Sequence, residues 1–188
     1  MSLEIEIKLR VDGHAVVRSA LEQCHARLVG KRLETNTFLD WADSSMRKAG
    51  QGLRVRRHQD IATGDITAVI THKGQKQPGE MKVREETEIG ISSYDDGVTL
   101  LTHLGLCVKL SFEKKREIWE LGDCEVVLDE LPENLGRFVE IEGPEESAVR
   151  KVQQQLGLAS ATAEGRSYAA ICGEHLAKSG REVMTFAD

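Results

Sequence analysis

Segments in which aliphatic and charged residues alternate set the strongest limit on how this chain can fold. In the clearest, the aliphatic residues are Leu3, Ile5, Ile7, Leu9 and Val11, and the charged residues between them are Glu4, Glu6, Lys8 and Arg10. Because successive side chains of a β-strand point to opposite sides, the pattern predicts a strand with one aliphatic and one charged face. Glu4 and Glu6 would stand roughly 6–7 Å apart, a spacing that suits a hard cation. Taken alone, the segment is explained as simply by an edge strand whose charged face meets water.

Strand and helix patterns continue through the whole chain. Further strands are expected at residues 33–40, 53–58, 66–73, 81–91, 108–121, 124–131 and 137–142. Helices are expected from Asp12 through His25 (with Leu28 on the same spacing and Gly30 ending the unit), and at about 44–49, 94–104, 144–157 and 167–178. Hairpin-type turns join several of the strands. We therefore expect one α+β domain over residues 1–180, built on an eight-stranded antiparallel closed barrel with helices outside, and a tail, 181–188, without a clear pattern.

Most of the expected strands repeat the charged face of the first. The acidic residues on these charged faces are Glu4, Glu6, Glu86, Glu88, Asp129, Glu140 and Glu142. The basic residues are Lys8, Arg54, Arg56, Lys73, Lys82, Arg84, Lys114 and Arg116. One interpretation is an ordinary solvated surface. The other is a barrel with a charged lumen and helices over its aliphatic outer face. Buried charges are costly unless they compensate each other or bind ions, and this mixture suits Mg²⁺ or Mn²⁺ together with phosphate. The pattern alone leaves both interpretations open.

Charge and cysteine content restrict the partners. The chain has 31 acidic against 25 basic residues, so nonspecific nucleic-acid binding is not expected. None of the four cysteines lies in a CxxC pair, which indicates reduced thiols in a cytoplasmic protein. No long apolar run or signal-peptide pattern is present, so no membrane partner is expected. We expect a monomer or homodimer whose partner is a small molecule.

Several motifs carry a family resemblance. Residues 4–8 (EIEIK) resemble the ExExK signature of the CYTH superfamily, which includes class IV adenylyl cyclases and thiamine triphosphatases. Similar motifs follow in the family's order: LRVR at 53–56, ITHKG at 70–74, KVREETE at 82–88, KKR at 114–116, the LD that contains Asp129, LGRFVEIE at 135–142, and SY at 167–168. The resemblance covers about residues 3–172 and implies the family's eight-stranded triphosphate tunnel.

The resemblance also implies roles. The residues that would hold Mg²⁺ or Mn²⁺ are Glu4, Glu6, Asp129, Glu140 and Glu142. Those that would bind the phosphate chain are Lys8, Arg54, Arg56, Lys73, Arg84, Lys114 and Arg116. Glu4, Glu6 and Lys8 would be catalytic. Glu86 and Glu88 would orient the arginines or, as the alternative, contact a metal.

The chain departs from the family pattern in one stretch. Asn36 stands where many relatives have Asp, and Phe38-Leu39 replaces an aromatic pair. These changes leave the non-phosphate part of the substrate open.

The expected activity is metal-dependent hydrolysis of the terminal phosphate of tripolyphosphate or an organic triphosphate. The alternatives are a class IV adenylyl cyclase, which converts ATP to cyclic AMP and pyrophosphate, and a non-catalytic polyphosphate-binding module.

Overall fold

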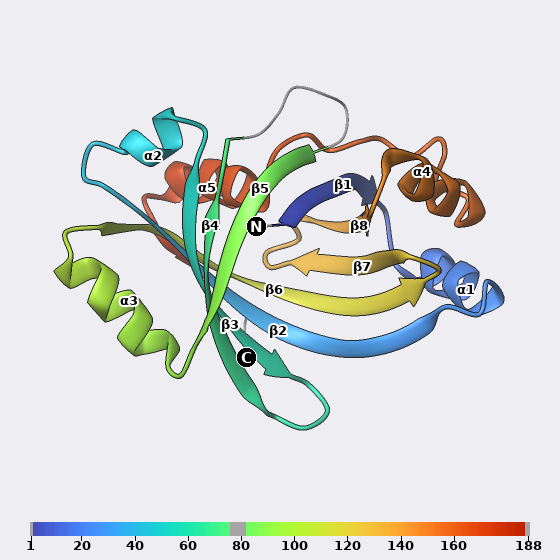
Figure 1. The fold of residues 1–188 in the computed structure, drawn as a ribbon, viewed down its shortest axis with the longest axis horizontal. Coiled ribbons are helices and arrows are strands. Elements are labelled where there is room, and N and C mark those ends of the chain that lie inside the picture. Colours follow the sequence, from blue (N-terminus) through green and yellow to red (C-terminus); the bar gives the residue numbers. More distant parts are fainter. Residues whose placement is uncertain (1, 76–81, 187–188) are drawn as a thin grey trace.

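A computed structural model describes residues 2–75 and 82–186, with side chains described from residue 5 to 75 and from 85 to 186. Eight strands carry the fold: β1 (Ser2–Val11), β2 (Arg27–Asp40), β3 (Gly52–Asp60), β4 (Ile66–Lys73), β5 (Lys82–Ile91), β6 (Cys107–Leu121), β7 (Cys124–Leu131) and β8 (Gly136–Gly143). They pair in the order β2-β3-β4-β5-β1-β8-β7-β6, always antiparallel. Because β2 also pairs with β6, the sheet closes into a barrel, which confirms the predicted fold class (Figure 1).

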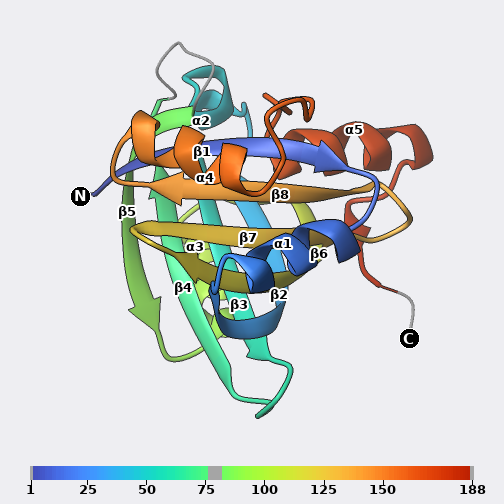
Figure 2. The ribbon, with the colours of Figure 1, turned by 90° about the vertical axis from the view of Figure 1, so that its right-hand side faces the viewer.

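The aliphatic faces of the strands form the main core, and this core lies outside the barrel. It is covered by α1 (Ala15–Gln23) and α4 (Glu146–Gln155), which lie over β1, β7 and β8 in Figure 2. The cluster includes Ile7, Leu9, Val126, Leu128, Val139 and Ile141 from the strands, and Val17, Leu21, Val149 and Val152 from the two helices. A smaller cluster under α3 (Tyr94–His103) covers β3 and β4. Removing these apolar faces from water stabilises the closed sheet with its charged faces inward.

Aromatic and aliphatic side chains fill one end of the barrel interior. Phe112, Leu131 and Phe138 lie there, and they pack against Ile171 and Leu176 of α5 (Tyr168–Ser179). The short helix α2 (Ser45–Lys48) follows β2. The packing of α5 against the apolar side chains places this helix across one end of the barrel interior, and the charged residues lie deeper in the barrel.

Several expected boundaries differ from the structure. Leu28 and Gly30 belong to β2, because α1 ends before His25, whose φ of 57° stops the helix. Pairing with the whole length of β6 then extends β2 back to Arg27, with an irregularity between Leu28 and Gly30. The fourth helix begins at Glu146 rather than at the preceding Pro144.

The C-terminal tail, for which no pattern was expected, forms a short strand. This strand, β9 (Val183–Met184), pairs with β6 in parallel, and Met184 is 1% exposed. Within the described residues, no helix combines the length and the apolar character needed to cross a membrane.

Candidate functional site

The barrel encloses a cavity of about 1180 Å³. Nine of the predicted site residues line it: Glu6, Lys8, Arg54, Arg56, Lys73, Lys114, Arg116, Glu140 and Glu142. The backbones of Glu4 and Arg84 pair directly between β1 and β5, but their side chains lie outside the described part of the structure. The interpretation of the charged faces as an inner lining is therefore the one that the structure shows.

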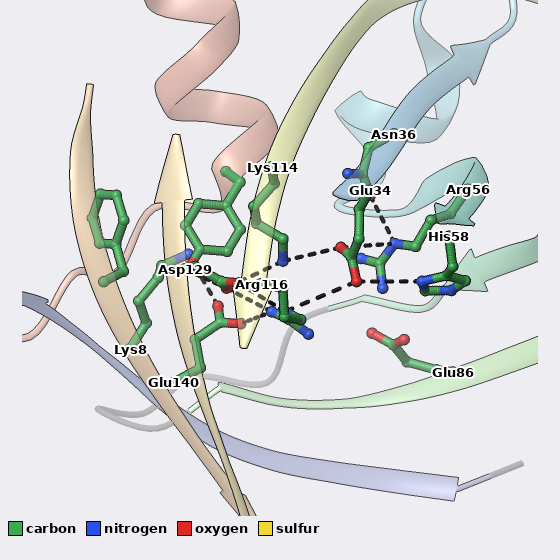
Figure 3. Close-up of polar contacts among 12 residues, drawn as sticks. Lys8, Glu34, Asn36, Arg56, His58, Glu86, Lys114, Arg116, Asp129 and Glu140 are labelled. Carbon is green, nitrogen blue, oxygen red and sulfur yellow. Dashed lines mark hydrogen bonds and ion pairs between the residues drawn. The ribbon is translucent and has the colours of Figure 1, made fainter. Parts of the chain in front are cut away.

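Asp129 lies at the centre of the basic cluster and is fully buried. Its carboxylate accepts two hydrogen bonds from Arg116, at 2.8 and 2.6 Å, and one from Lys114 Nζ at 3.1 Å (Figure 3). The Tyr168 hydroxyl donates a further hydrogen bond at 2.8 Å. In this arrangement the Asp129 oxygens face protein donors. Asp129 thus holds the basic side chains in place, and its implied role as a metal ligand stays a prediction.

Glu34 is a second buried acid of this cluster, which the sequence analysis missed. Its Oε2 lies 3.3 Å from Lys114 Nζ and 3.5 Å from Arg56 Nε, and the side chain is 1% exposed. Burial raises the pKa of Glu34, but Arg56, Lys114 and Arg116 outweigh it and hold the pKa well below its usual value. The carboxylate is therefore ionised and compensates part of the basic charge. Alternation with Asn36 along β2 was the only signal that could have found it.

Lys8 lies beside Glu140 and the ring of Tyr168. Its Nζ is 3.6 Å from Glu140 Oε1 and 3.8 Å from the centre of the ring. Glu140 also accepts a hydrogen bond from Arg116 at 2.7 Å. The N-terminus of α5 positions Tyr168, where Ser167 caps the helix by accepting a hydrogen bond from Ala170 N. Burial, followed by the charge of Asp129, raises the pKa of Tyr168 well above its usual value, so the hydroxyl stays neutral.

The wall formed by β3, β4 and β5 presents Arg54 and Lys73. Arg54 donates to Thr71 Oγ1 at 3.2 Å, and Thr71 in turn donates to Glu88 at 2.7 Å. Lys73 forms an ion pair with Glu86. Burial, followed by the charge of Arg56, lowers the pKa of Arg54 to about 9. Glu34, Glu86 and Glu88 act in the opposite direction and favour its positive charge, and an anion in the cavity would favour that charge further.

Carboxylates gather at the end of the cavity opposite α5. Glu6 pairs with Glu142 across β1 and β8, and Glu142 pairs with Glu125 across β8 and β7. Glu6 is buried, whereas Glu125 and Glu142 are exposed at the open end. Glu142 is only partly removed from water, and this partial burial, followed by the charges of Glu6 and Glu125, raises its pKa to about 7. Such a set of oxygen donors suits a hard divalent cation. Among the described residues, however, no three His, Cys, Asp or Glu side chains gather closely enough to hold a metal ion.

The raised pKa of Glu142 has a testable effect on stability. Because the pKa of Glu142 is higher in the folded than in the unfolded protein, its protonated carboxyl stabilises the folded state. This contribution is fully present below pH 4.5, the pKa of the residue in the unfolded chain, and is lost as the pH rises through about 7. In EDTA we expect Glu142→Gln to unfold at a higher temperature than the wild type at pH 8, but at the same temperature near pH 5. After a discount for solvent screening at this exposed site, the gain is on the order of 1 kcal/mol. Calorimetry at both pH values measures it, with the exposed Glu146→Gln as control. Equal unfolding temperatures of Glu142→Gln and wild type at pH 8 would count against the carboxylate repulsion.

Comparison with known proteins agrees with this geometry. The model of the CYTH domain matches residues 2–168. The adenylate cyclase CyaB of Aeromonas hydrophila is 26% identical over 96% of this chain and 94% of its own length. The PH1819 protein of Pyrococcus horikoshii has the same fold, with a TM-score of 0.79 and 26% identity over 92% of this chain and 99% of that one. HpAC1 of Hippeastrum, described as an adenylyl cyclase candidate with a dominant triphosphatase activity, has a TM-score of 0.71 at 18% identity over 96% and 97% of the two chains.

Proposed function

Because the chain belongs to the CYTH domain family, we propose that it is a divalent-metal-dependent hydrolase that cleaves the terminal phosphate of a triphosphate inside the barrel. The observation that carries the proposal is the lining of the cavity. Ten described lysines and arginines line it, and six of these are predicted phosphate-binding residues: Lys8, Arg54, Arg56, Lys73, Lys114 and Arg116. An acidic set stands at one end of the same cavity, and the two together match a phosphate chain bound with a metal.

The basic residues would bind and orient the phosphate chain. Arg116 and Lys114 are held by Asp129, so their positions are fixed before a ligand enters. Arg54 is buried next to Arg56, and a phosphate oxygen would offset the cost of these two neighbouring positive charges. Fixed cations of this kind stabilise the charge that develops on a leaving phosphate without reorganisation, and charge stabilisation is the main requirement of phosphoryl transfer.

Glu6 and Glu142 are the described residues best placed to hold the metal. The two residues pair across β1 and β8. The raised pKa of Glu142 is the effect expected of neighbouring carboxylates without a bound cation. Bound Mg²⁺ or Mn²⁺ would neutralise phosphate charge and lower the pKa of the attacking water. Lys8 would contact the phosphate next to this end, because its Nζ lies beside Glu140.

An adenylyl cyclase is the second candidate, and the name of the Aeromonas hydrophila relative favours it. The same basic cluster would then orient ATP for attack by its ribose hydroxyl on the α-phosphorus. HpAC1, which shares the fold, is described with a dominant triphosphatase activity, so hydrolysis is among the chemistries that this fold supports. A non-catalytic polyphosphate-binding module explains the acidic end less well, because anion binding alone requires no carboxylates.

The products formed from ATP separate these candidates. We expect incubation with ATP and Mg²⁺ or Mn²⁺ to release orthophosphate and ADP, resolved by anion-exchange chromatography. Cyclic AMP together with pyrophosphate would show instead that the protein is a cyclase. Tight binding of both ATP and tripolyphosphate with no product from either would favour the binding module.

Arg54→Ala should weaken binding of the phosphate chain. Arg54 is buried in the cavity wall, and a hydrogen bond to a charged partner contributes about 10- to 100-fold in affinity. We expect the apparent KM for tripolyphosphate to rise by about this factor, measured by phosphate release. The control is Arg57→Ala, because Arg57 lies on the outer face of the same strand and bonds Thr35. An unchanged KM in Arg54→Ala would argue against the phosphate role of this residue.

A further inference from the structure

Asn36 lies on the inner face of β2, between Glu34 and Phe38, and lines the cavity. Its side chain is 1% exposed. Its Oδ1 accepts a hydrogen bond from Arg56 Nε at 2.8 Å. Because the arginine side chain can only donate, the amide oxygen must face Arg56, and this fixes the orientation of the amide. The amide nitrogen is therefore turned away from Arg56, as Figure 3 shows.

The amide nitrogen is a donor in need of an acceptor. Nδ2 of Asn36 is buried and has no hydrogen-bond partner among the described residues. The same holds for Nε of Arg54, which also lines the cavity. Asn36 pairs with Arg56 and Phe38 pairs with Arg54, so the two donors lie diagonally on neighbouring strands, within reach of one ligand group. Native proteins leave few buried donors unsatisfied, so two such donors in one cavity wall indicate an acceptor from outside the chain.

We propose that Asn36 binds the substrate directly, with Nδ2–H donating to an oxygen of the phosphoryl group that Arg54 also contacts. The inference rests on the proposed function in taking a phosphate chain as the ligand. The nearby side chains of Arg54, Arg56 and Lys114 are positively charged donors, so a negatively charged phosphate oxygen is a favourable acceptor there. The amide adds a donor without adding positive charge to this cluster. An aspartate at the same position would instead oppose the phosphate and offer no donor when ionised. Asn36 is thus a specificity-determining residue for an anionic acceptor.

Two variants of similar size test the donor. Asn36→Leu removes both polar atoms, whereas Asn36→Asp keeps an oxygen for Arg56 and removes the donor. Binding of inorganic tripolyphosphate is measured by titration calorimetry in EDTA, where metal-dependent turnover does not proceed. We expect each variant to bind about 10-fold more weakly than the wild type or worse. The control is Gln153→Leu, because Gln153 lies in α4 outside the barrel and already donates to Leu158 O. We expect it to bind as the wild type does.

Side-chain amide NMR separates direct contact from an effect through Arg56. The Asn36 Nδ2 proton signals, identified by their loss in Asn36→Asp, should shift downfield on saturation with tripolyphosphate. The Gln153 amide signals should stay in place. Unshifted Asn36 signals, wild-type affinity in both variants, or no tripolyphosphate binding by the wild type would each overturn the proposal. Binding with the expected shift, but without phosphate release when metal is added, would instead refute hydrolysis and leave the role of Asn36 standing.

Discussion

Asp129→Ala is expected to lower the free energy of unfolding by about 3–5 kcal/mol, since removal of one partner from a buried ion cluster leaves uncompensated charge. Asp129 is fully buried and accepts hydrogen bonds from Arg116, Lys114 and Tyr168. Without it, Lys114 and Arg116 remain in the interior, and among the described side chains the remaining acidic ion-pair partners are Glu34 and Glu140. Urea unfolding monitored by circular dichroism measures the loss.

Glu130→Ala is the matched control for this experiment. Glu130 follows Asp129 in β7 but points outward, where it pairs with Arg137 at 2.9 Å in partly exposed surroundings. Such surface pairs contribute about 0–1 kcal/mol, so the control should unfold almost as the wild type does. If Asp129→Ala lost no more stability than Glu130→Ala, Asp129 would not be the residue that holds the basic cluster together.

Glu6→Gln is expected to keep the fold and to reduce metal-dependent turnover by about 100-fold or more, since a bound metal contributes several kcal/mol to phosphoryl transfer. Glu6 lies at the acidic end of the cavity and is paired with Glu142 across the strands. Glutamine has the same shape, but its amide is a much weaker ligand for Mg²⁺ or Mn²⁺. The rate of phosphate release at saturating tripolyphosphate, over a range of metal concentrations, measures the effect.

The control for Glu6→Gln is Glu120→Gln. Glu120 lies on β6, where its exposed side chain pairs with Arg27 outside the cavity. We expect wild-type turnover from this control and an unchanged circular dichroism spectrum from both variants. Wild-type turnover in Glu6→Gln at every metal concentration would remove this residue from the metal site.

Alternation of charge along single strands identified the residues that line the barrel, whereas the inward direction of that face followed from the family resemblance and not from the pattern alone. Glu6 and Lys8 of β1, and Glu140 and Glu142 of β8, follow directly from this two-residue period. Glu34 was missed for a physical reason. Its partner Lys114 stands opposite only because β2 closes the barrel against β6, and this pairing joins residues far apart in the chain.

The interactions of Tyr168 and Asp129 were also beyond the sequence. The SY motif was recognised, but nothing in it indicates that α5 brings the ring to within 3.8 Å of Lys8 Nζ. Asp129 was assigned to a metal through family resemblance, whereas its contacts in the structure are with Arg116, Lys114 and Tyr168. Whether a carboxylate pairs with basic side chains or binds a metal ion depends on the charges that surround it in the folded protein. No local sequence pattern reveals those charges.

Phosphorus NMR of tripolyphosphate incubated with the protein and Mg²⁺ tests the central claim most directly. If the cavity binds a phosphate chain and cleaves its terminal phosphate, the tripolyphosphate signals should give way to equal amounts of orthophosphate and pyrophosphate. EDTA should stop the conversion. Tripolyphosphate that stays intact, while ATP is turned over to cyclic AMP and pyrophosphate under the same conditions, would contradict the claim.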